Sequence, residues 1–101
     1  MPQIYQTKSA GRDLDAIWDY IGIENHNPQA ANELIDEFNE TYLLLATNPG
    51  LGQSVERLSA NLRRFVVRKN YLIFYEPTTD GILVVRVLHA ARDITSRLFD
   101  F

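Results

Sequence analysis

Three closely spaced runs of β-branched and aromatic residues in the second half of the sequence constrain its fold most strongly. They lie near residues 63–68, 71–76 and 82–89, and such runs are typical of β-strands. Only Lys69-Asn70 separates the first two, and Asp80-Gly81 before the third is a turn signal. The pattern predicts an antiparallel meander of three strands.

Both faces of this sheet are expected to be apolar. Large apolar side chains occupy both alternating sets: Ile73 and Tyr75 against Leu72 and Phe74, and Val84 and Leu88 against Val85 and Val87. Consecutive side chains of a strand point to opposite faces, so neither face can be left to solvent. One face therefore needs a helical cover, and the other needs the C-terminal segment 91–101, a partner, or both.

The first half predicts one short strand at residues 3–8 and then two helices. Apolar side chains recur there at helical spacing: Leu14, Ile17, Trp18 and Ile21, then Ala31, Leu34, Ile35, Phe38, Tyr42 and Leu45. Ser9 is expected to cap the first helix, which ends around Gly22 and Asn25. Asn27-Pro28 begins the second helix, and Asn48-Pro49-Gly50 stops it.

These elements predict an α+β fold in a single domain spanning residues 1–101. An N-terminal strand leads into an antiparallel helix hairpin, which packs on a three- to four-stranded, mostly antiparallel sheet. Trp18 belongs to the apolar stripe of the first helix and is expected to pack against that sheet. The 46% of apolar residues in 101 positions is enough for one core.

Composition narrows the cellular setting and the kinds of partner. There is no cysteine, which excludes a disulfide framework and a cysteine zinc site. We expect a cytoplasmic protein without a membrane span, because neither a signal-peptide pattern nor 18 continuous apolar residues occur. Glu33, Asp36, Glu37 and Glu40 are interpreted as a solvated helix face, and no metal site or cofactor is expected.

Charge is distributed unevenly along the chain. Residues 1–50 carry two basic and eight acidic side chains, a balance of −6, and residues 51–101 carry eight basic and five acidic, a balance of +3. The net charge of −3 argues against a protein whose main work is neutralising phosphates. Direct sequence-specific binding of nucleic acid is therefore not expected.

Several stretches together resemble the ParE branch of the RelE/ParE toxin superfamily. They are residues 13–21 and 28–31, Asn48-Pro49-Gly50-Leu51-Gly52, and residues 62–67, 71–76 and 86–93. The resemblance covers nearly the whole chain. It implies the toxin of a type II toxin–antitoxin system, which inhibits DNA gyrase by binding and is neutralised by a ParD-like antitoxin. An apolar groove along the helix hairpin and sheet would accept an amphipathic segment of that antitoxin.

Two alternatives stay open. The sister RelE branch comprises ribosome-dependent mRNA endonucleases, for which His89 would serve as acid or base and Arg63 and Arg92 would bind the phosphate. The favoured interpretation of His89 is instead a partly buried imidazole bonded to the backbone or to Asp93. The other alternative is a non-toxic corepressor that binds only the antitoxin.

The side chains expected to meet a partner are mostly basic or C-terminal: Arg57, Arg63, Arg64, Arg68, Arg86, Arg92, Leu98, Phe99 and Phe101. Arg86 lies among valines in the third run, where an unpaired charge is costly, so it is expected to be ion-paired or on an exposed face. Alternation sends Arg63 and Arg64 to opposite faces. The C-terminal apolar residues either complete the core or touch a partner, and the resemblance implicates this region in toxicity.

Overall fold

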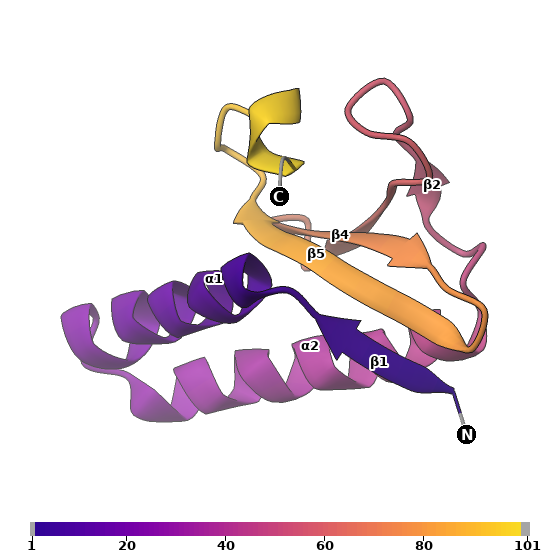
Figure 1. Ribbon diagram of the computed structural model, residues 1–101. Helices are drawn as coiled ribbons and strands as arrows, with labels where there is room; N and C mark the ends of the chain where they lie inside the picture. The colour runs from indigo at the N-terminus through magenta and orange to yellow at the C-terminus, as the bar shows by residue number, and fades with distance from the viewer. Residues whose placement is uncertain (1, 100–101) are drawn as a thin grey trace.

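The three predicted strands form the centre of a five-stranded sheet whose helical layer lies on one face (Figure 1). The structure is a computed structural model that describes residues 2–99. Along the chain the elements are β1 (Gln3–Gln6), α1 (Lys8–Asp19), η1 (Tyr20–Glu24), α2 (Pro28–Thr47), β2 (Gln53–Ser54), β3 (Arg63–Val67), β4 (Tyr71–Pro77), β5 (Gly81–His89) and η2 (Ser96–Phe99). The predicted α+β class, helix hairpin and meander are confirmed.

The sheet contains one strand more than the sequence predicted. Its order is β1-β5-β4-β3-β2, with β1 parallel to β5 and the other pairs antiparallel. The extra strand, β2, has only two residues, which is too short to show an alternating pattern. Gly81 permits the pairing of β5 with β1, because a Cβ at this position would lie 1.8 Å from the carbonyl oxygen of Gln3.

A β-bulge in β5 overturns the alternation expected for this strand. Phe74 and Tyr75 are adjacent in β4 and lie opposite Arg86 and Val84. Val85 therefore has no partner in β4 and is the extra residue of the bulge. Val84 and Val87 consequently enter the core on the helical face, while Val85 and Leu88 enter the core on the other face. The sequence had grouped Val84 with Leu88, because strict period-two alternation does not allow for an inserted residue.

The helices begin at side-chain caps, only one of which was predicted correctly. Asn27 caps α2 as expected, its side-chain oxygen accepting a hydrogen bond from the amide of Ala30 at 3.1 Å. Thr7, and not Ser9, caps α1, accepting from the amide of Ala10 at 3.0 Å. Both hydroxyls suit the role; Thr7 is selected by a second bond, which its hydroxyl donates to the sheet.

The end of α1 widens into η1, a π-helical turn. There the six-membered ring of Trp18 lies against Gly22, where an added Cβ would be only 2.8 Å from the ring. The indole nitrogen of Trp18 donates a hydrogen bond to Asn32 of α2 at 2.9 Å. Trp18 therefore joins η1 to α2, and it is not among the side chains that pack on the core between the helices and the sheet.

Two apolar cores cover the two faces of the sheet. The core between the helices and the sheet includes Ala10, Leu34, Phe38, Tyr42, Leu45, Ile73, Tyr75, Ile82, Val84 and Val87. The core on the opposite face consists of Val55, Leu62, Leu72, Phe74, Val85, Leu88 and Phe99. Both the C-terminal turn and the loop between β2 and β3 lie over this second face (Figure 1). The expected C-terminal cover is confirmed, and the cover by the loop was missed.

Candidate partner-binding surface

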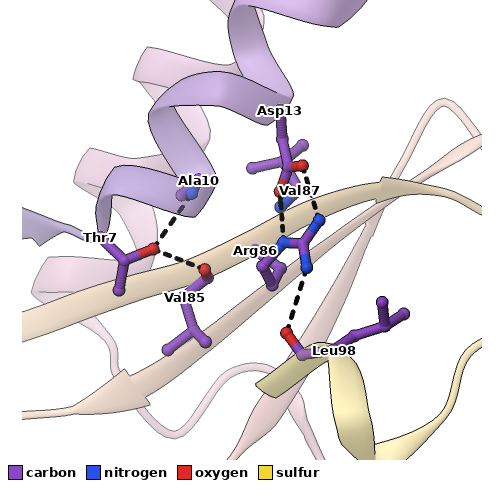
Figure 2. A network of polar contacts seen from close by, with 7 residues as sticks. All are labelled: Thr7, Ala10, Asp13, Val85, Arg86, Val87 and Leu98. Atoms are coloured by element: carbon purple, nitrogen blue, oxygen red, sulfur yellow. Dashed lines mark hydrogen bonds and ion pairs between the residues drawn. The ribbon is translucent and has the colours of Figure 1, made fainter. Parts of the chain in front are cut away.

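Arg86 forms a largely buried ion pair with Asp13 of α1 (Figure 2). Its Nε and Nη2 atoms donate to the two carboxylate oxygens at 2.8 and 2.9 Å. The side chains are only 14% and 11% exposed. The hydrogen bonds with Asp13 raise the pKa of Arg86 above its usual range, against the opposing effect of burial. Of the two positions expected for Arg86, the structure selects internal pairing.

This ion pair completes an edge of the sheet that β1 leaves open. β1 pairs only with residues 81–84 of β5, so the next backbone groups of β5 need other partners. The carboxylate of Asp13 accepts a hydrogen bond from the amide of Val87 at 3.0 Å, and Thr7 donates its hydroxyl to the carbonyl of Val85 at 2.7 Å. Side chains from α1 and its cap thus replace a neighbouring strand (Figure 2).

The same arginine also positions the C-terminal turn. The Nη1 atom of Arg86 donates to the carbonyl of Leu98 at 3.1 Å. Phe99 is buried, and its ring lies 4.8 Å from that of Phe74 between centroids. Leu98 and Phe99 therefore complete the second core, which is one of the two roles expected for them. Phe101 lies outside the described residues.

The residues proposed for RNA cleavage are not brought together. On β4, Arg63 lies opposite Tyr75 and His89 lies opposite Tyr71. Arg63 and His89 are therefore four positions apart along the strands and two strands apart across the sheet. This separation corresponds to roughly 16 Å. Arg63 is also engaged, donating to the carbonyls of Gly52 and Gly50 at 2.8 and 3.0 Å. Only Arg92 is near His89, in the turn that follows β5.

His89 has the backbone partner expected for it, but it is not buried. Its Nδ1 atom accepts a hydrogen bond from the amide of Ala91 at 3.0 Å, and its ring meets Tyr71 edge-on with centroids 5.4 Å apart. The imidazole is exposed, so the predicted partial burial is wrong. Its exposure follows from its place at the last position of β5, beyond the cover of both cores.

The basic stretch from Arg57 to Lys69 is divided among different neighbours. Arg64 donates to the side chain of Gln53 at 2.7 Å, and Arg68 pairs with Glu37 of α2 at 2.9 Å. Arg57 and Lys69 are exposed, and no carboxylate of residues 2–99 lies within 4.0 Å of either. The stretch therefore does not converge on one anion, although its exposed members are accessible to a partner.

An apolar hollow of about 200 Å³ opens between the end of α1 and the sheet. Its walls are Ala16, Ile17, Tyr20, Ile21, Tyr71 and His89. Tyr20 and Ile23 remain 52% and 60% exposed at this end of the hairpin. The hollow lies at the junction of hairpin and sheet, where an apolar groove was expected. The positions of Tyr71 and His89 in its wall carried no sequence signal.

Neither a metal centre nor a membrane-spanning helix is found in the described part of the chain. Within residues 2–99, no three His, Cys, Asp or Glu side chains are grouped to hold a metal ion. Over the same range, every helix is too short or too polar to cross a bilayer.

A family model, two toxins and one solved structure are each similar to most of this chain. A family model described as the ParE toxin of the type II toxin–antitoxin system parDE matches residues 4–94. Two toxins of Caulobacter vibrioides are similar over 92 residues, or 91% of this chain: ParE1 is 29% identical over 93% of its length, and RelE2 is 36% identical over 99%. A solved structure of the chromosomal ParDE system from P. aeruginosa shares the fold, with a TM-score of 0.70 and 22% identity, covering 88% of this chain and 96% of that one.

Proposed function

Because this chain belongs to the ParE toxin family of type II toxin–antitoxin systems, we propose that it inhibits DNA gyrase by binding and that a ParD-like antitoxin neutralises it. The inhibitor acts through a surface that fits its target, in the cytoplasm where gyrase works. No bond of a substrate is made or broken in this proposal.

The apolar hollow is the observation that carries the proposal. Ile17, Tyr20, Ile21 and Tyr71 offer a recess to which an apolar side chain can bind, and Ile23 adds an exposed apolar surface nearby. Aromatic anchors in such recesses supply most of the free energy of binding at protein interfaces. An amphipathic segment of the antitoxin that fills the recess would therefore bind tightly.

The dispersal of the candidate nuclease residues supports binding over catalysis. A general base and a cation that act on one phosphate must both reach it within hydrogen-bonding distance. Arg63 and His89 lie roughly 16 Å apart by the strand geometry, and Arg63 already binds two backbone carbonyls. Of the two arginines proposed to bind the phosphate, only Arg92 is near His89. The similarity to a toxin named RelE2 nevertheless makes a direct test of RNA cleavage essential.

The target is tested by adding the purified chain to two reactions. We expect loss of supercoiling of relaxed plasmid by gyrase, and no cleavage of ribosome-bound mRNA in a translation extract. His89→Asn retains an acceptor for the amide of Ala91 but cannot act as a base, so it tests cleavage of mRNA; because His89 lines the apolar hollow, it is not used as a control for gyrase inhibition. His26→Asn, at the chain's other histidine, is the control. Cleavage of mRNA that His89→Asn abolishes and His26→Asn preserves would establish the endonuclease instead.

Neutralisation is tested by co-expressing the chain with the ParD-like antitoxin of its own locus. Tyr20→Ser should weaken the complex, whereas Leu51→Ser should not, although the two side chains are equally exposed at 52% and 51%. Equal loss of antitoxin binding in both variants would argue against the apolar hollow as the docking site. Expression without the antitoxin should arrest growth; normal growth would favour the non-toxic corepressor.

A further inference from the structure

A second depression, here called the interhelical groove, runs between α1 and α2. It encloses about 400 Å³, and its lining residues are Gln6, Gly11, Leu14, Asp15, Trp18, Ile35 and Asn39. None of them belongs to the wall of the apolar hollow. Leu14, Trp18 and Ile35 contribute the apolar part of its lining, so the groove offers a binding surface separate from the one already described.

Trp18 is a fixed aromatic surface in this groove. Its indole nitrogen is held by Asn32, and its six-membered ring rests against Gly22. A side chain at position 22 would collide with the ring, because its Cβ would lie 2.8 Å away. The indole is therefore set in place before any partner arrives, which lowers the entropic cost of binding to it.

The charged side chains near Trp18 are mostly acidic. Asp15 lines the groove beside it, Asp19 lies one helical turn further along α1, and Asp36 adjoins Ile35 on α2. All three carboxylates are exposed, and no arginine or lysine nitrogen of residues 2–99 lies within 4.0 Å of them. Of the two basic side chains of α1, Lys8 lies in its first turn and Arg12 lies one helical turn before Asp15, and α2 has none.

We propose that the interhelical groove binds a cationic amphipathic segment of a protein partner, which places an arginine or lysine on the Trp18 indole. A cation over a tryptophan face is attracted by the negative face of the ring. The carboxylate of Asp15 adds a favourable charge, while Leu14 and Ile35 receive the apolar neighbours of the cation. An acidic or purely apolar segment would lack both the attraction to the Trp18 ring and the attraction to the Asp15 carboxylate. The proposal holds whichever target the chain inhibits.

The experiment uses the purified full chain and two short helical peptides, one of leucine and lysine and one of leucine and glutamate. Trp18 is the chain's only tryptophan, so its fluorescence reports directly on occupancy of the groove. We expect the lysine peptide to change the emission of Trp18 with an affinity that falls as salt rises. The glutamate peptide should leave the emission unchanged.

Variants then locate the contact, with affinity measured from the anisotropy of a labelled lysine peptide. Asp15→Asn and Trp18→Phe should each weaken binding about three- to fivefold. Glu56→Gln removes the same charge from the loop after β2 and should leave binding unchanged. Equal weakening by Glu56→Gln and Asp15→Asn would show attraction to net charge alone, and equal binding of the glutamate peptide would show a merely apolar contact. Either result overturns the proposal.

Discussion

Replacing Asp13 by alanine removes three hydrogen bonds that join α1 to β5. Two of these bonds come from Arg86, and the third comes from the amide of Val87. Arg86 would keep only its bond to the carbonyl of Leu98. The variant leaves a guanidinium and a backbone amide without their acceptor in a part of the molecule that solvent hardly reaches.

The loss of folding stability expected for Asp13→Ala follows from the burial of the ion pair between Asp13 and Arg86. Removing one partner of a buried ion pair costs about 3–5 kcal/mol, because the remaining charge is left uncompensated. Asp13 and Arg86 are 11% and 14% exposed, which places them near that regime. A domain of this kind is stable by about 5–15 kcal/mol, so Asp13→Ala should consume a large part of its stability. Asp13→Asn retains an acceptor for Val87 and should cost about 1–3 kcal/mol.

Urea unfolding followed by circular dichroism measures these differences. The exposed pair of Arg68 and Glu37, at 47% and 37% exposure, provides the control, since Glu37→Ala should cost no more than about 1 kcal/mol. In the double variant Asp13→Asn/Arg86→Met, the loss should be smaller than the sum of the two single losses. If Asp13→Ala were no more destabilising than Glu37→Ala, the role assigned to the buried pair would be refuted.

Three further changes test individual contacts. Gly81→Ala should destabilise the fold by at least about 1–3 kcal/mol in urea, because the added methyl would lie 1.8 Å from a carbonyl oxygen of β1; Gly50→Ala meets nothing within 4 Å and should be nearly silent. Tyr42→Phe should leave stability unchanged or raise it by up to about 1 kcal/mol, since the buried hydroxyl has no partner among residues 2–99; a clear loss would reveal an overlooked bond. The Tyr5 hydroxyl lowers the pKa of Asp80. The hydrogen bond between them therefore stabilises the fold above about pH 4, and this contribution is lost as pH falls through the lowered pKa. An NMR titration of Tyr5→Phe should find the pKa of Asp80 higher than in the unchanged protein.

The sequence by itself determined the helix hairpin and the meander. Apolar side chains at helical spacing identified α1 and α2, and alternating β-branched and aromatic residues identified β3, β4 and β5. Both kinds of pattern are local, because each reports how one segment turns its apolar side to a core. The same reasoning showed that this sheet would need cover on both faces.

The tertiary structure decided between local alternatives that the sequence left close in energy. Thr7 and Ser9 both suit a helix cap, and the bond from Thr7 to β5 selects the former. The bulge at Val85 changes which valines share a face. The strand β2 exists only because two residues pair with β3.

The candidate surfaces were also beyond the reach of local pattern. Asp13 and Arg86 are 73 positions apart, and the apolar hollow joins residues of α1 to Tyr71 and His89. Local periodicity shows which face of an element is apolar, but it does not show which distant element that face will meet. Contacts between elements that are distant in sequence form only when the whole chain packs. Each such contact contributes free energy only when both elements are in place.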